Sequence, residues 1–289
     1  MEDRFIRTFV LFVVLTIIFG ILERLWPSIP NQPKLRRGLG VDILYWFFIP
    51  MVNQVLAILS TALVIIPIYF LLGRSLALNH ILAGYGPLAQ IPLWQQGLIV
   101  IVLGDFIGYW THRVNHRFTP LWNFHAVHHS AEIMDWLTAV RIHPVNDMFS
   151  KAVQAIPILL LGFSPLAVEL YTPVLSCYVA MIHANLFWTY GPFRHILASP
   201  AFHRWHHAMD KKAWGKNYAG LFPVYDVLFG TFYLPRGQQP REFGIDGETI
   251  PDNFVAQMRY PFRHWKFFNK TQRLKSQLQE PNPPTRVEV

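Results

Sequence analysis

Cysteine is almost absent from this chain, since Cys177 is the only one among 289 residues. A single cysteine excludes an intramolecular disulfide framework and a metal cluster built on several thiolates. Cys177 lies in an apolar run, where we expect a buried structural thiol. Any metal site in this protein must therefore use nitrogen and oxygen ligands.

Charged residues are also scarce. They make up 15% of the chain, whereas soluble domains contain about 25%. Hydrophobic residues make up 52% of the chain, and they gather in blocks long enough to enter a bilayer. This composition excludes an ordinary soluble domain and predicts a polytopic membrane protein.

The net charge of +8 indicates a membrane surface rather than nucleic acid. Basic residues such as Arg24, Lys34 and Arg36 flank apolar segments, and others lie in the C-terminal third. This placement follows the positive-inside rule and suits contact with anionic lipid headgroups. Because the basic residues form neither a reading helix nor an arm, we predict no nucleic-acid binding.

The first apolar blocks predict membrane helices. Residues 9–22 lack a small-residue cleavage pattern, so we expect a retained anchor. Residues 43–72 exceed the roughly 20 needed for one span, and Pro50 interrupts them. They could form one long kinked helix, but we favour a short interfacial piece followed by a span over residues 55–72. Residues 75–92 then predict a loop.

The apolar segment 93–110 continues without a helix breaker into His112 and His116, so the emergent end of this helix should carry both histidines. Asp105 shares one helix face with them. An aspartate within a membrane is costly unless it is paired. Asp105 could bond to a neighbouring helix or orient a metal-bound imidazole.

A helical hairpin is predicted next, with arms at residues 152–161 and 166–188. Its return arm brings His183 towards the other histidines. Ser199 and Pro200 then predict an N-cap followed by the first helical position. Residues after about 270 predict a disordered tail.

Eight of the thirteen histidines fall into three clusters: His112 and His116; His125, His128 and His129; His203, His206 and His207. Spacings of three and four residues place the imidazoles of each cluster on one helix face. So many nitrogen donors would oversupply a single tetrahedral ion. Two ions, with room for an exogenous ligand, are therefore the natural count.

The order of these clusters resembles the fatty acid hydroxylase/sterol desaturase superfamily of integral-membrane di-iron enzymes. The matching motifs are DFIGYWTHRVNH (105–116), FHAVHHS (124–130), RIHP (141–144), HAN (183–185), FHRWHH (202–207) and YDVLFGT (225–231). They span roughly residues 105–235. The Glu-x-x-His pattern of soluble di-iron carboxylate proteins is absent.

The apolar blocks predict an all-α fold with about four to five transmembrane or re-entrant helices. The parity of these spans and the positive-inside rule place the histidine-lined di-metal cap on the cytoplasmic side. We divide the chain into an N-terminal transmembrane scaffold (1–104), a di-iron catalytic domain (105–235) that includes a membrane hairpin at about 152–188, and a cytoplasmic C-terminal segment (236–289).

The resemblance also implies that the eight clustered histidines bind two irons, which zinc can replace in purified protein, with His183 as a ninth ligand. Arg141, Asn185, Asn217 and Asp226, together with Asp105, become candidates for supporting the ligands. His143 could be a ligand, a donor to a ligand or a structural histidine at a helix end. We expect His80, His195 and His264 to be ordinary interfacial residues.

The implied reaction is a dioxygen-dependent hydroxylation or desaturation of an unactivated C–H bond in a lipid, such as a sterol or a fatty acyl chain. The lipid would enter from the bilayer. A separate protein would supply the electrons, because no haem-attachment, flavin or dinucleotide motif is visible.

Three alternatives compete with this prediction. Fatty-aldehyde C–C cleavage or ether-lipid oxidation could use the same scaffold. A histidine-lined metal transporter belongs to another class, and it predicts ionisable residues within several spans. Only Asp105 and Glu169 fall inside apolar segments, which argues against transport.

Overall fold

A computed structural model describes residues 2–263 of the chain. The predicted tail after residue 270 and His264 lie outside the described residues. The described part is all-α, as predicted, and contains isolated β-bridges but no strand. Its helices are α1 (Glu2–Leu25), α2 (Leu39–Leu71), α3 (Leu78–Ala83), η1 (Pro87–Gln90), α4 (Leu93–Arg117), α5 (Thr119–His129), η2 (Trp136–Val140), α6 (Pro144–Leu160), α7 (Pro165–His183), η3 (Gly191–His195), α8 (Pro200–His206), η4 (Lys211–Ala213), α9 (Val224–Leu228) and α10 (Phe254–Arg263).

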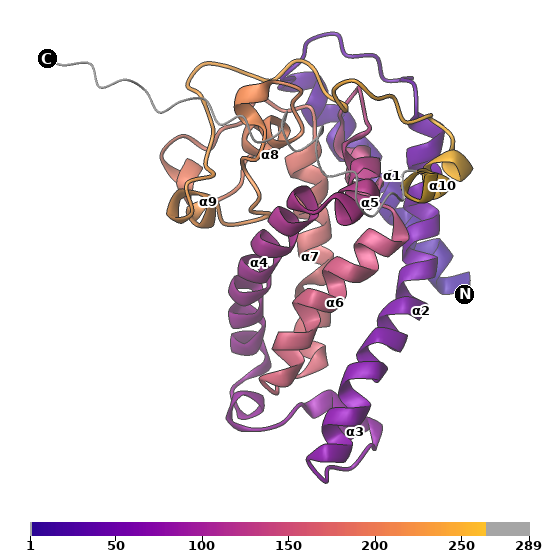
Figure 1. The fold of residues 1–289 in the computed structure, drawn as a ribbon, viewed down its shortest axis with the longest axis vertical. Helices are drawn as coiled ribbons and strands as arrows, with labels where there is room; N and C mark the ends of the chain where they lie inside the picture. The colour runs from indigo at the N-terminus through magenta and orange to yellow at the C-terminus, as the bar shows by residue number, and fades with distance from the viewer. Residues whose placement is uncertain (1, 264–289) are drawn as a thin grey trace, which may run out of the picture.

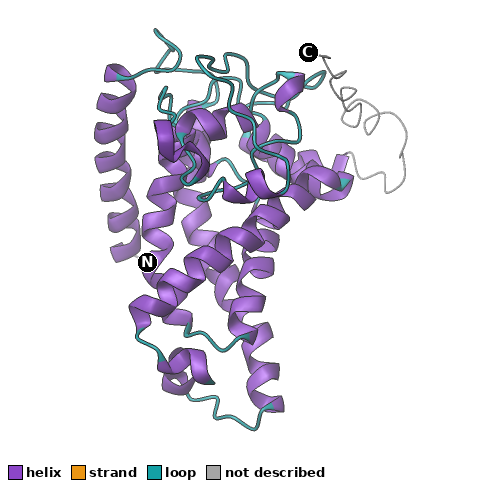
Figure 2. Ribbon diagram, turned by 90° about the vertical axis from the view of Figure 1, so that its left-hand side faces the viewer, coloured by secondary structure: helices purple, strands orange, loops and turns teal. Residues whose placement is uncertain are grey.

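The long helices form a bundle that carries a cap at one end. Helices α2, α4, α6 and α7 run along the length of the molecule, and α6 packs against both α2 and α4 (Figure 1). Helices α5, α8, α9 and α10 lie with long loops at the upper end (Figure 1). Helix α1 packs against α2 on the flank of the bundle (Figure 2).

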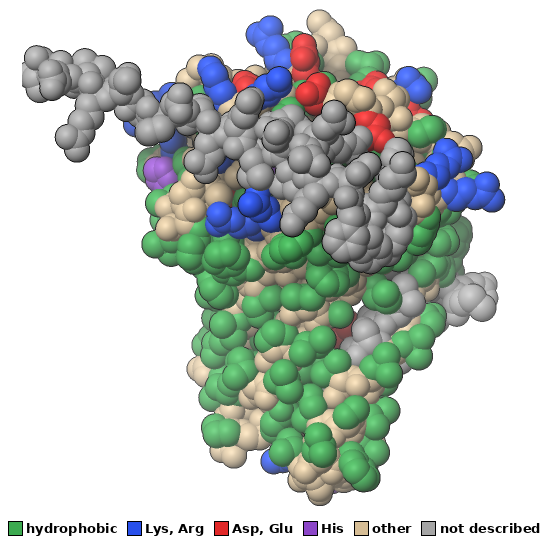
Figure 3. Space-filling model, viewed as in Figure 1, with side chains coloured by type: hydrophobic (Ala, Val, Ile, Leu, Met, Phe, Trp, Pro, Cys, Tyr) green, Lys and Arg blue, Asp and Glu red, His purple; other side chains and the backbone are tan. Residues whose placement is uncertain are grey.

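The surface of the bundle is apolar, whereas the cap is charged. Hydrophobic side chains cover the lower part of the molecule, and Lys, Arg, Asp and Glu gather around the upper part (Figure 3). Leu63, Phe70 and Leu71 of α2 are 76%, 77% and 81% exposed. Large apolar side chains on the outside of a bundle are typical of a surface that contacts lipid.

Among the described residues, one helix, Phe5–Leu25, is long and apolar enough to cross a membrane. Shorter apolar helices cover Leu39–Val52, Ala62–Leu71 and Val174–His183. The predicted number of four to five spans, and their orientation, therefore stay predictions.

Residues 43–72 do not follow the interpretation that we favoured from the sequence. It is not an interfacial piece followed by a separate span, because α2 runs unbroken through Pro50 and Pro67. A proline removes one N–H and clashes with the preceding turn, but the turns on both sides keep their hydrogen bonds. The long-helix alternative is the correct one. The predicted loop 75–92 likewise contains α3 and η1.

The predicted hairpin is present as α6 and α7, but its first helix begins earlier and its second helix ends earlier than expected. Helix α6 already begins at Pro144, and α7 ends at His183 rather than at residue 188. Beyond His183 the chain leaves the helix, and Leu186 forms an isolated antiparallel bridge with Pro27. Between the arms, the Ser164 hydroxyl caps α7 by accepting from the N–H of Leu166.

Candidate metal centre

The histidine clusters come from four helices that meet in the cap. His112 and His116 lie on the last turns of α4, and His183 ends α7. The second cluster lies in the last turns of α5. The third cluster lies on α8, with His207 as the C-cap. Helix α8 begins as predicted, since Ser199 Oγ accepts from the N–H of Phe202 and Pro200 follows it.

These nine histidines gather into two groups, and the possible ligand atoms in each group lie within 4.8 Å of one another. The first group is His112, His116, His125, His129 and His206, and the second is His128, His183, His203 and His207. Helices α5 and α8 each contribute to both groups, which places the groups side by side. Two groups agree with the expected count of two ions, while ligation itself stays a prediction.

In the first group, the Nε2 atoms of His112 and His125 face each other, and each carries a lone pair. His112 Nδ1 donates to the carbonyl of Tyr218 at 2.8 Å, and His125 Nδ1 donates to Asn146 Oδ1 at 3.1 Å. A neutral imidazole has one N–H and one lone pair. The Nε2 atoms of His112 and His125, 3.1 Å apart, therefore both present lone pairs. Such a pair cannot form a hydrogen bond with itself, but a cation between the two atoms satisfies both.

The second group repeats this arrangement. His128 Nδ1 donates to the carbonyl of Arg141 at 3.2 Å, and His183 Nδ1 donates to the carbonyl of Val179 at 2.7 Å. Their Nε2 atoms are 3.2 Å apart, and His203 Nε2 lies 3.1 Å from His183 Nε2. Metal–nitrogen bonds of about 2.0–2.1 Å give nitrogen–nitrogen separations of roughly 3.0–3.4 Å around one ion. The observed spacing fits a coordination shell.

Buried nitrogen atoms without a partner support the same conclusion. Nε2 of His116 and Nε2 of His206 are buried and bonded to nothing in the described part of the chain. His206 Nδ1 donates to the carbonyl of Lys216 at 2.8 Å, which leaves a lone pair on its Nε2. Buried polar atoms rarely lack a partner. The donor set therefore fits a pair of metal ions that accept nitrogen ligands.

Burial keeps these imidazoles neutral. It lowers the pKa of His125, His128 and His129 well below the usual range, and neighbouring imidazoles lower the pKa further. The histidines of α8 behave in the same way: burial lowers the pKa of His203, His206 and His207. Metal binding needs the neutral form, so the site is ready to bind metal at neutral pH.

One loop orients two of the clustered histidines, which lie on different helices. The carbonyls of Lys216 and Tyr218 accept from His206 and His112, and Asn217 lies between them with a left-handed φ of 60°. The Asn217 amide donates to the carbonyls of Phe202 and Tyr233. Asn217 thus contacts no histidine side chain in the described structure, and it acts through the loop backbone.

Two aspartates hold the same region. The Asp226 carboxylate accepts from the N–H groups of Tyr218 and Ala219. Asp105 accepts from the N–H groups of Leu221 and Phe222 at 2.8 and 2.7 Å. Both interpretations of Asp105 were wrong, because the carboxylate bonds neither to a helix nor to an imidazole. Its partners are the backbone N–H groups of Leu221 and Phe222, which lie outside any helix.

Arg141 and Asn185 support the site less directly than expected. The Arg141 carbonyl binds His128, while its guanidinium binds Asp42. Asn185 pairs with the backbone of Ile29, and its N–H donates to Glu23. Its side chain therefore joins the cap to the segment after α1 instead of contacting a ligand.

The structure assigns His143 to a structural role. Its Nδ1 accepts from the N–H of Val145 at the start of α6, and its Nε2 donates to the carbonyl of Met258. It belongs to neither histidine group. His80 and His195 also lie outside the groups and are exposed, while their interfacial position stays a prediction.

Sequence reasoning missed Asn146 and the carbonyl partners of the histidines. Asn146 lies in the first turn of α6, outside every histidine motif, and only the packing of α6 against α5 brings it to His125. A carbonyl partner carries no residue signature, so the sequence contained no signal for the contributions of Val179, Lys216 or Tyr218.

Comparison with known proteins gives a consistent result. A model of the fatty acid hydroxylase family matches residues 97–231, which contain all nine histidines. Ornithine lipid hydroxylase from Rhizobium tropici is 33% identical over 174 residues, or 60% of this chain and 52% of that protein. Alkylglycerol monooxygenase from Homo sapiens is 33% identical over 161 residues, or 55% of this chain and 34% of that protein.

A more distant relative is a very-long-chain aldehyde decarbonylase from Oryza sativa subsp. indica, 28% identical over 160 residues, or 49% of this chain and 25% of that protein. The chain spans about half the length of the first of these relatives and about a third or less of the other two. No solved structure matches the chain.

Proposed function

The chain belongs to the fatty acid hydroxylase family, and from this premise we propose that it is a membrane-bound di-iron oxygenase acting on a lipid. The reaction would take dioxygen, protons and a pair of external electrons, and it would convert a C–H bond of the lipid into C–OH with water as the second product. Loss of two hydrogens to give an alkene is the related outcome on the same site.

The facing lone pairs of the histidine groups carry this proposal. In one group, the Nε2 atoms of His112 and His125 carry lone pairs and lie 3.1 Å apart. In the other group, the Nε2 atoms of His128 and His183 lie 3.2 Å apart. These distances match the separation of two nitrogen ligands on one metal ion. Neutral imidazole suits iron, zinc and copper. Bound irons would supply the redox chemistry that an unactivated C–H bond requires.

The side chains around the histidines would hold this geometry. Oxygen acceptors on Nδ1 fix both the tautomer and the ring orientation of a metal-binding histidine. The carbonyls of Tyr218, Lys216, Arg141 and Val179, with Asn146 Oδ1, fill this role for five of the nine rings. The ligands are thus preorganised, which limits the movement needed when metal binds.

The surroundings favour a lipid substrate. The bundle below the cap exposes large apolar side chains, and α1 is apolar enough to cross a membrane. We propose that the protein spans the membrane several times, that its cap faces the cytoplasm, and that a lipid chain reaches the histidines from the bilayer. A separate protein would deliver the electrons.

The test is lipid analysis of cells that express the intact protein, the His128→Ala variant or the His143→Ala variant, grown under ¹⁸O₂. We expect a lipid that gains one labelled oxygen with the intact protein and with His143→Ala, but not with His128→Ala. A lipid that loses two hydrogens without gaining oxygen would identify a desaturase instead. No change in any lipid, or fewer than two metals in the purified intact protein, would refute the proposal.

A further inference from the structure

A second site lies in the connection between α7 and α8, away from the histidine groups. It is a pocket of about 400 Å³, and its lining shares no residue with either group. The residues that line it are Thr189, Gly191, Pro192, Arg194, His195 and Arg236. Arg194 and Arg236 carry positive charge and no lining residue is acidic, so the pocket is a local concentration of positive charge.

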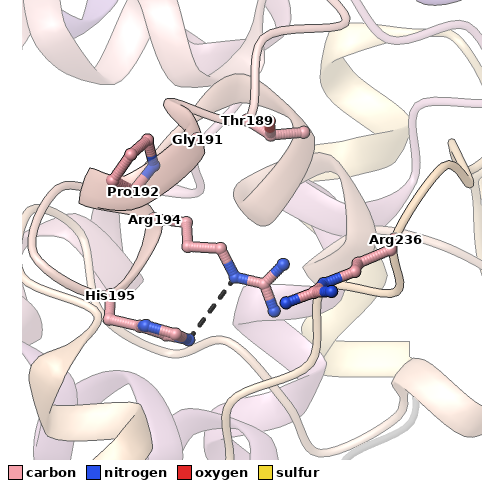
Figure 4. A pocket seen from close by; sticks show the side chains of 6 residues that line it. All are labelled: Thr189, Gly191, Pro192, Arg194, His195 and Arg236. Atoms are coloured by element: carbon pink, nitrogen blue, oxygen red, sulfur yellow. Dashed lines mark hydrogen bonds between the residues drawn. The ribbon is translucent and has the colours of Figure 1, made fainter.

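The two arginines converge within this pocket. Their guanidinium groups point toward one another (Figure 4). Arg194 also lies 5.5 Å over the ring of Phe232, and its Nε donates to His195 Nε2 at 3.4 Å. These contacts leave the terminal nitrogens of Arg194 facing Arg236. No carboxylate among the described residues pairs with either guanidinium, and like charges in this position repel each other.

The most direct way to satisfy two converging guanidinium groups is a shared anion. A guanidinium binds phosphate in a planar, bidentate manner, and one phosphate can accept from two such groups at once. The hydroxyl of Thr189 is a further possible donor in the lining of the same pocket. The pocket volume suits a headgroup rather than a single small ion.

The surroundings of the pocket indicate that the anion belongs to a membrane lipid. Phe193 and Ile196, which flank the basic pair in sequence, are 60% and 55% exposed, and Phe187 is 46% exposed. Trp188 directly precedes Thr189 in the chain, and its ring packs against Trp26 of the segment after α1, with ring centroids 5.7 Å apart. Exposed aromatic and aliphatic residues beside basic ones are typical of the headgroup level of a bilayer.

We propose that this pocket binds the phosphate of an anionic phospholipid, with Arg194 and Arg236 clamping its oxygens. The site goes beyond the oxygenase function and does not depend on it, because no metal ligand lines the pocket. It would fix the depth and orientation of the cap at the membrane surface.

Lipid retention by the full-length, metal-loaded protein tests this proposal. The protein is reconstituted in vesicles with equal amounts of phosphatidylglycerol and phosphatidylcholine, extracted, and examined by native mass spectrometry. We expect phosphatidylglycerol to stay bound in preference to phosphatidylcholine. The double variant Arg194→Gln/Arg236→Gln should retain about tenfold less of it, since each lost contact is a charge-assisted hydrogen bond.

A matched control is Lys211→Gln/Lys212→Gln, which removes the same charge from exposed positions of the cap. It should retain phosphatidylglycerol like the intact protein, and Arg194→Lys/Arg236→Lys should fall between. An equal loss in the lysine double variant would mean diffuse attraction and overturn the proposal. So would equal retention of phosphatidylcholine, or displacement of the lipid by inorganic phosphate at equal concentration. Metal content should stay unchanged in every variant, which separates this result from the fate of the oxygenase proposal.

Discussion

Asp42 binds Arg141 with both carboxylate oxygens, Oδ1 accepting from Nε at 2.6 Å and Oδ2 from Nη2 at 2.9 Å. Both side chains are almost completely buried, and Arg36 donates to the same carboxylate at 2.7 Å. The carbonyl of Arg141 in turn accepts from His128. Arg141 therefore connects Asp42 of α2, through its side chain, with His128 of the second histidine group, through its carbonyl.

Replacing Asp42 with asparagine should strongly destabilise the protein. The change removes the carboxylate that holds the buried Arg141 guanidinium at 2.6 and 2.9 Å, while Arg36 keeps its pair with Asp135. Breaking a buried pair costs about 3–5 kcal/mol. Chemical unfolding of the micelle-embedded protein measures this loss. Arg37→Gln is the control: it removes the charge of an exposed arginine that pairs with Asp252 and should cost about 0–1 kcal/mol. A similar cost for both variants would contradict this account of the network.

His128 and His143 should respond differently to substitution by alanine. His128 belongs to the four-histidine group, so His128→Ala should lower the metal content from two ions per chain to about one. His143→Ala should keep both ions and lose about 0.5–2 kcal/mol of stability, because it removes a helix cap. Elemental analysis and thermal unfolding give the two quantities. Metal loss in His143→Ala would show that its structural assignment is wrong.

The histidine clusters were predictable because their chemistry lies in side chains at helical spacing. The start of α8 was also predictable, because a serine N-cap followed by proline begins a helix through interactions within one turn. His183 was found through its motif, and the structure brings it within hydrogen-bonding distance of His128 and His203. These features depend on residues close in sequence.

Features that depend on backbone and tertiary packing were not predictable. Asp105 is a polar residue on an apolar helix, and no pattern shows that its partners are N–H groups more than a hundred residues away. The path of α2 through Pro50 was missed for a different reason. The effect of a proline on a helix is local, whereas the tertiary packing of α2 against α6 cannot be predicted from the residues around Pro50.

Asn217 should control metal affinity without being a ligand. Asn217→Ala removes three side-chain hydrogen bonds and places at a φ of 60° a residue that adopts this conformation less readily than asparagine does, so the carbonyls of Lys216 and Tyr218 should shift. We expect the affinity for one of the two metals to fall about 10–100-fold. A chelator titration that resolves two release steps measures this. Asn217→Gly tolerates the backbone conformation but lacks the amide, so it should recover only part of the loss; full recovery would mean that the amide contacts contribute nothing.

Metal removal should lower the thermal stability of the protein, because the facing Nε2 lone pairs in each histidine group would lose the cation that they share. A ligand that binds only the folded state adds about 4 kcal/mol at a thousandfold excess over its dissociation constant. The unfolding temperature of the intact protein should therefore fall by several degrees after exhaustive chelation and recover when ferrous iron is added back. His128→Ala should show a smaller fall, since one group is already impaired. The matched control is His143→Ala, whose fall should equal that of the intact protein. Equal unfolding temperatures with and without metal would mean that the facing Nε2 atoms of His112 and His125 are satisfied in some other way.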